Sequence, residues 1–139
     1  MIALLAAGAA VILLDQWTKR MVASHLANRH VALGRVMQVK YIQNKRSIYT
    51  QNGVRAILVL IWLIALVSAI LLHRSDARFQ NSISVLGLGA ALGGAAGNLA
   101  DIIRKGGVTD FIDFGWWPAF NVADVAILAG LAIVLWPTV

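Results

Sequence analysis

The 139-residue chain contains no cysteine, no glutamate and only two prolines. The absence of cysteine excludes disulfides, thiolate metal sites and cysteine nucleophiles. Charged residues make up 13% of the chain, roughly half the share that soluble domains carry. Hydrophobic residues make up 60%. This balance predicts an integral membrane protein.

Lysine and arginine outnumber the acidic residues by 12 to 6, which gives a net charge of +6. The basic residues are not gathered in one compact run, and the chain is too apolar for a typical nucleic-acid-binding protein. We therefore expect the positive charge to attract anionic lipid headgroups, and we predict no nucleic-acid partner. The first apolar run has no basic residues before it, which favours a retained span over a cleaved signal peptide.

Four apolar segments predict an all-α membrane protein with four transmembrane helices, at about residues 1–21, 55–73, 82–101 and 122–137. We expect them to form a single integral membrane domain over residues 1–139, with both termini on one side. The polar stretch at about 22–54 contains short β-like runs and turn signals, so we expect a small β-sheet in this first extramembrane loop. In the third segment Gly89, Gly93 and Gly97 recur every four residues, which is typical of closely packed transmembrane helices.

Three of the six aspartates lie between Gly106 and Asp124. Acidic residues at a membrane are costly and suggest function. Because the third and fourth helices are joined by a short connection, we expect Asp110 and Asp124 to face each other. Two carboxylates in a medium of low dielectric share one proton. Such a pair can activate water and protonate a leaving amine, which is aspartic-protease chemistry and needs no metal or other cofactor.

Other roles account for the same residues equally well at this stage. Asp124 or Asn121 is a suitable N-cap for the fourth helix. Asp113 is expected to be a solvated loop residue or a turn former. Asp15 and Lys19 are spaced as a simple intrahelical ion pair.

The tryptophans suggest a structural role, and the histidines do not suggest a site. Trp116 and Trp117 are expected to anchor the chain at the headgroup level. The three histidines have no metal-ligand spacing, so no metal site is predicted.

Several ordered blocks closely resemble the lipoprotein signal peptidases, also called type II signal peptidases (peptidase family A8). They are "DQWTK" (Asp15–Lys19), "GGAAGNLAD" (Gly93–Asp101), "GGVTDFID" (Gly106–Asp113) and "WPAFNVAD" (Trp117–Asp124). The resemblance implies an aspartic endopeptidase that removes the signal peptide of a prolipoprotein, cutting just before its diacylglyceryl-modified cysteine. It implies that Asp110 and Asp124 are catalytic. It also implies a supporting or substrate-binding set: Asp15, Lys19, Asn44, Asn98, Asp101 and Asn121.

The same resemblance implies a multi-pass protein of the bacterial inner membrane, with its active site toward the periplasmic face. Membrane lipids and the prolipoprotein signal peptide are the expected partners, and a monomer is the expected state. The distribution of basic residues favours the opposite orientation, because ten of the twelve lie in or beside the two longer loops.

Two departures from the family pattern keep an alternative open. The pattern has Arg where this chain has Ile102, with Arg104 two residues later as a candidate replacement. The stretch "NKRSIYT" (Asn44–Thr50) is bulkier and more charged than the corresponding family loop. The alternative is a divergent membrane-binding protein of the same fold, either non-catalytic or with another substrate. A channel or transporter subunit is a third, weaker reading.

Overall fold

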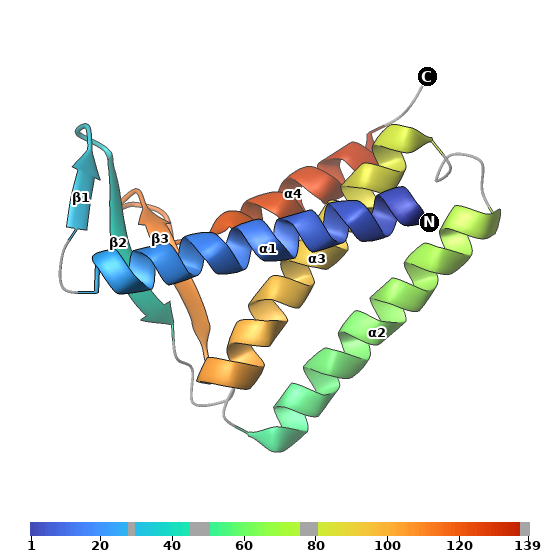
Figure 1. The fold of residues 1–139 in the computed structure, drawn as a ribbon, viewed down its shortest axis with the longest axis horizontal. Helices are drawn as coiled ribbons and strands as arrows, with labels where there is room; N and C mark the ends of the chain where they lie inside the picture. Colours follow the sequence, from blue (N-terminus) through green and yellow to red (C-terminus); the bar gives the residue numbers. More distant parts are fainter. Residues whose placement is uncertain (28–29, 45–50, 76–80, 137–139) are drawn as a thin grey trace.

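The computed structural model describes residues 1–27, 30–44, 51–75 and 81–136. Within these ranges three helices pack closely, a fourth diverges from them, and a small sheet lies at one end (Figure 1). The predicted fold class is thereby confirmed. The elements in chain order are α1 (Ile2–His25), β1 (His30–Leu33), β2 (Met37–Asn44), α2 (Asn52–Ser75), α3 (Ser82–Lys105), β3 (Val108–Asp113) and α4 (Val122–Leu135).

The helices α1, α2 and α3 are each 24 residues long and apolar enough to cross a membrane. At 1.5 Å per residue each spans about 36 Å. The helix α4 has 14 residues, or about 21 Å. Both α1 and α3 run four residues beyond their expected ends. The last residue predicted for α4, number 137, lies outside the described residues.

Met1 and the last turn of α4 lie at the end of the molecule opposite the sheet (Figure 1). The amino group of Met1 donates a hydrogen bond to Nε2 of His73, near the C-terminus of α2, at 3.4 Å. The expectation that both termini share one side of the membrane stays a prediction, because residues 137–139 lie outside the described ranges.

The sheet has three antiparallel strands in the order β1-β2-β3. The sheet expected in the first loop is present as β1 and β2. The sequence did not predict the third strand, β3, which comes from the segment after α3. Most residues of β3 are buried, since the strand pairs with β2 and also contacts α3 and α1. A strand covered on both faces lacks the alternation that identifies strands in a sequence. Its pairing sets Asp110 opposite Ile42.

The glycine repeat in α3 brings the helix backbones together. A Cβ on Gly93 would overlap the backbone of Gly8 in α1, and a Cβ on Gly94 would overlap the carbonyl oxygen of Ala123 in α4. A Cβ on Gly97 would lie 2.7 Å from Oδ2 of Asp15. The prediction of close helix packing is confirmed, and the packing fixes how the acidic residues of α1, α3 and α4 meet.

Replacing Gly93 with Ala is expected to destabilise the protein. The added methyl group would meet backbone atoms of Gly8 that cannot move aside, and overpacking of this kind costs about 1–3 kcal/mol. Thermal unfolding in detergent measures the effect. Gly53→Ala is the matched control, because a Cβ there meets nothing within 4 Å. Equal melting temperatures for Gly93→Ala and wild type would contradict the packing role.

Candidate active site

Asn121 joins the two aspartates that the sequence paired. Its Nδ2 donates a hydrogen bond to Oδ1 of Asp110 at 2.8 Å, and its backbone N–H donates to Oδ2 of Asp124 at 3.1 Å. Asn121 is fully buried and Asp110 is 5% exposed, whereas Asp124 is half-buried. The site therefore has one carboxylate withdrawn into the protein and one that reaches its surface.

The start of α4 explains how Asn121 takes this position. Asn121 has extended backbone geometry and is the N-cap of the helix, and its side chain accepts a hydrogen bond from the backbone N–H of Asp124. The side chain of Asp124 in turn accepts the backbone N–H of Asn121, which completes a capping box. The capping role and the site role of Asp124 are thus compatible, because one carboxylate oxygen caps while the other faces Asn98.

Burial raises the pKa of Asp110, and the negative charge of Asp124 raises it further. Hydrogen bonds from Asn121 and Asn44 and the positive charge of Lys19 act in the opposite direction, but the pKa remains above its ordinary value. Asn44 ends β2, so the sheet also supplies a contact to the pair. This environment favours a protonated Asp110 beside Asp124.

Lys19 connects the aspartates of α1 and α3 to the site. Its Nζ lies 2.8 Å from Oδ2 of Asp15 and 3.2 Å from Oδ2 of Asp101, and all three side chains are fully buried. It also donates to Oδ1 of Asn98 at 2.8 Å, and Asn98 donates to Oδ1 of Asp124 at 2.8 Å. The Asp15–Lys19 pair is therefore part of a network across three helices, and not an isolated intrahelical pair.

The two buried carboxylates hold the backbone beside the paired aspartates. Oδ1 of Asp15 accepts the N–H of Ala123 at 3.0 Å. Oδ2 of Asp101 accepts the N–H of Thr109 at 3.2 Å. Ala123 precedes Asp124 and Thr109 precedes Asp110, so each contact fixes the residue next to one member of the pair.

Asp113 was expected to be a solvated loop residue or a turn former, and the first of these two roles is wrong. It is 6% exposed and forms an ion pair with Lys40 of β2. It also accepts hydrogen bonds from Gln38 at 2.9 Å and from the N–H of Gly115 at 2.8 Å. The hydrogen bond with Lys40 lowers the pKa of Asp113. The bond to Gly115 confirms the turn-forming role, and the others fix β3 to β2.

Comparison with known proteins supports the resemblance noted in the sequence. The family described as Signal peptidase (SPase) II matches residues 7–139. This chain belongs to the signal peptidase II family. It is 32% identical to a lipoprotein signal peptidase of Halothermothrix orenii over 90% of this chain and 87% of that protein. It is 35% identical to one of Syntrophomonas wolfei, over 90% and 85% of the two chains.

Solved structures show the same fold. Two structures described as bacterial membrane enzymes superpose with TM-scores of 0.78 and 0.80. Each covers 97% of this chain, and this chain covers 86% and 91% of them. Both are 22% identical in sequence, so the likeness concerns the fold.

The residues around Ile102 include another cation close to Asp101. Arg104 was the candidate replacement for the arginine of the family pattern, but the cations that pair with Asp101 are Lys19 and Lys105. Nζ of Lys105 lies 2.8 Å from Oδ1 of Asp101. Lys105 also donates to Oγ1 of Thr109 at 3.2 Å. Sequence reasoning missed Lys105, although it lies one helical turn after Asp101, the spacing at which helix side chains meet.

Ile102 itself lies in a hollow of about 250 Å³ between α2 and α3. Eight of the nine lining residues are hydrophobic, and the polar one is Asn98, which hydrogen-bonds to Asp124. The hollow thus leads from an apolar surface to the edge of the aspartate pair. The lining residues are Leu58, Ile61, Trp62, Ala65, Leu92, Ala95, Asn98, Leu99 and Ile102.

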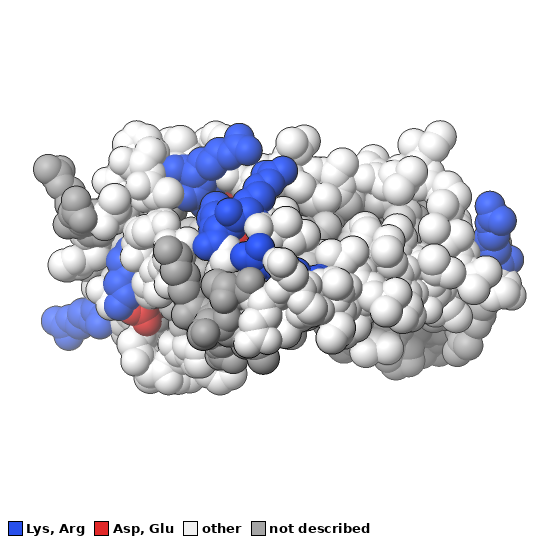
Figure 2. Space-filling model, turned by 90° about the horizontal axis from the view of Figure 1, so that it is seen from below, with Lys and Arg blue, Asp and Glu red and all other residues white. Residues whose placement is uncertain are grey.

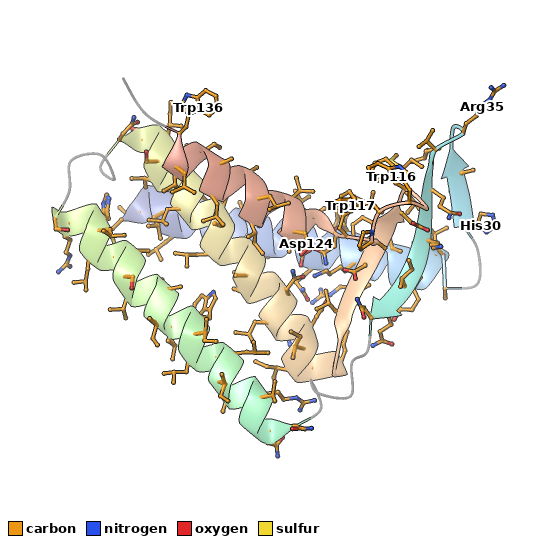
Figure 3. All side chains as sticks on the ribbon, turned by 180° about the vertical axis from the view of Figure 1, so that it is seen from behind. His30, Arg35, Trp116, Trp117, Asp124 and Trp136 are labelled. Atoms are coloured by element: carbon orange, nitrogen blue, oxygen red, sulfur yellow. The ribbon has the colours of Figure 1, made fainter. Side chains whose placement is uncertain are left out.

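Trp116 and Trp117 lie near the start of α4, close to Asp124, whereas Trp136 lies at the far end of that helix (Figure 3). All three are exposed, Trp116 and Trp136 at 74% each and Trp117 at 55%. Exposed tryptophans at the two ends of an apolar helix are typical of residues at the two membrane surfaces. The headgroup-level role of Trp116 and Trp117 stays a prediction.

Proposed function

We propose that the protein is an aspartic endopeptidase of the inner membrane that removes signal peptides from prolipoproteins, cutting before a diacylglyceryl-modified cysteine. The observation that carries this proposal is the link through Asn121 between a buried Asp110 and a half-buried Asp124. The family relatives named lipoprotein signal peptidase supply the substrate class.

We assign the proton that the pair shares to Asp110, because burial and the negative charge of Asp124 both raise the pKa of Asp110. Asp124 accepts a proton from water, whose oxygen attacks the scissile carbonyl carbon, and Asp110 donates its proton to the carbonyl oxygen. When the carbon–nitrogen bond breaks, the proton held by Asp124 passes to the leaving amine. Asp110 recovers a proton from a hydroxyl group of the tetrahedral intermediate.

The location of the pair suits a lipid-anchored substrate. The pair lies where β3 and the start of α4 meet Asn98, in the last third of α3; Figure 3 shows Asp124 at the start of α4. The hollow between α2 and α3 offers an apolar path to Asn98 beside the pair. An apolar signal-peptide segment fits this path, while the lipidated cysteine stays at the membrane surface. The sheet end of the molecule faces the periplasm, and the protein acts as a monomer.

The second candidate is a relative with another substrate or with no catalysis. Ile102 favours it, because the hollow has an apolar side chain at the position where the family pattern has a cation. The network around Asp101 favours catalysis, since Lys105 supplies a cation to it.

Cleavage in liposomes tests the proposed function. The purified protein is reconstituted with a diacylglyceryl-modified prolipoprotein, and mass spectrometry identifies the product. Cleavage is expected just before the modified cysteine. A precursor with serine in place of that cysteine is the control and should stay intact. If the folded protein leaves the modified precursor uncut, the second candidate is correct.

A further inference from the structure

A second hollow, of about 650 Å³, lies between α1 and the C-terminal end of α3, and its lining residue Gln16 contacts the buried charge network. Its walls are Ile12, Leu13 and Leu14, and its other lining residues are Gln16, Trp17, Arg20 and Arg104. The apolar residues come from the middle of α1, whereas the two arginines lie toward the sheet end of their helices. The hollow is therefore apolar at one end and cationic at the other.

The two arginines are not neutralised by the part of the chain that the structure describes. Neither Arg20 nor Arg104 forms an ion pair or a side-chain hydrogen bond there, and both are exposed. The aspartates of α1 and α3, Asp15 and Asp101, are fully buried and already paired with Lys19 and Lys105. Figure 2 shows that basic side chains gather on the sheet half of the face seen there, with little acid exposed.

The order of residues along α1 follows the order of chemical groups in a membrane leaflet. From Ile12 to Arg20 the helix rises about 12 Å, from purely apolar side chains past Trp17 to a guanidinium. Trp17 is 59% exposed, and tryptophan prefers the boundary between acyl chains and headgroups. The amide of Gln16 is directed inward, where it donates to Asp15 and to the carbonyl oxygen of Gly97. The arginines thus provide the polar contacts at the mouth of the hollow.

We propose that this hollow is a binding site for an anionic phospholipid, with its phosphate between Arg20 and Arg104 and the upper part of an acyl chain against Ile12, Leu13 and Leu14. Guanidinium groups bind phosphate oxygens in pairs of hydrogen bonds. Basic pockets between transmembrane helices bind anionic lipid headgroups. The site is separate from the aspartate pair, so the inference does not depend on the proposed function.

Native mass spectrometry of the detergent-solubilised protein tests the site. Equal amounts of dioleoyl phosphatidylglycerol and dioleoyl phosphatidylcholine are supplied, and the ratio of the two lipid adducts is measured. The wild type is expected to retain the anionic lipid preferentially. The double variant Arg20→Gln, Arg104→Gln is expected to lower the ratio about 30-fold, since each of the two basic contacts contributes on the order of 1 kcal/mol.

The double variant Arg35→Gln, Arg74→Gln is the matched control. It changes the net charge by the same amount, but neither residue lines the hollow. Arg35 lies in the turn between β1 and β2, and Arg74 lies at the C-terminal end of α2. It should keep the wild-type lipid ratio, and all three proteins should melt alike. Each of four results would overturn the proposal: no preference in the wild type, an equal loss in the control, displacement of the lipid by millimolar inorganic phosphate, or an unchanged lipid ratio in Arg20→Gln, Arg104→Gln.

Discussion

The variant Asp110→Asn is expected to lose cleavage and to be more stable than the wild type at neutral pH. Cleavage is lost because an amide cannot donate and recover the proton, and a positioned acid or base contributes about 100-fold or more to the rate. Stability rises because a buried carboxylate beside Asp124 is costly to ionise. The asparagine keeps an oxygen that can accept the hydrogen bond from Asn121.

The pH dependence follows from the raised pKa of Asp110. Below the unfolded pKa of the group, the protonated form contributes its full stability. As the pH rises through the folded pKa, the wild type loses that contribution, whereas Asp110→Asn has nothing to lose. The stability difference between the two proteins should therefore be absent in acid and appear as the pH rises toward neutral. Melting temperatures in detergent across this range measure it.

The variant Asp124→Asn should lose cleavage too, but with the opposite effect on stability. The carboxylate of Asp124 closes the capping box of α4 and lies at the positive end of the helix dipole. Loss of an anion there costs about 0.3–1 kcal/mol. Asp113→Asn is the control for cleavage, because Asp113 holds β3 to β2 and takes no part in the pair. Unimpaired cleavage by either Asp110→Asn or Asp124→Asn would contradict the assignment of the pair.

Sequence reasoning predicted the helices because their apolar runs are long, and it predicted the approach of Asp110 to Asp124 because the connection between α3 and α4 is short. It did not predict β3, whose pairing with β2 joins residues about seventy positions apart. A strand of this kind is specified by its partners and by its burial on both sides. Its own pattern of residues carries little of that information.

The sequence identified some of the residues that support the aspartate pair and missed others, because the contacts of the missed residues also depend on tertiary structure. The family blocks contain Asp15, Lys19 and Asp101, so the sequence alone identified these residues as part of the supporting set. Lys105 lies between two of these blocks, whereas Thr109 lies inside one of them. The contacts of both residues depend on how the chain passes from α3 into β3. The burial of Asp113 was missed because aspartate near glycine usually indicates an exposed turn, whereas here Lys40 pairs with it.

The variant Lys19→Met is expected to be the most destabilising substitution in the network. Lys19 is the cation shared by Asp15 and Asp101, and all three side chains are fully buried. Methionine fills a similar volume but leaves Asp15 without a cation in its ion pair. Removal of one partner from a buried ion pair costs about 3–5 kcal/mol. Cleavage should fall as well, because Lys19 holds Asn98 against Asp124.

The effect is measured as the loss of thermal stability in detergent, with Lys40→Met as the matched control. Lys40 also pairs with an aspartate, Asp113, but its side chain is 37% exposed, and exposed pairs contribute about 0–1 kcal/mol. Adding Asp15→Asn to Lys19→Met should recover part of the stability, because it removes the carboxylate left without a partner while keeping an oxygen for the N–H of Ala123. If Lys19→Met and Lys40→Met lose equal stability, or if Asp15→Asn deepens the loss, the buried network does not hold the helices together through its charges.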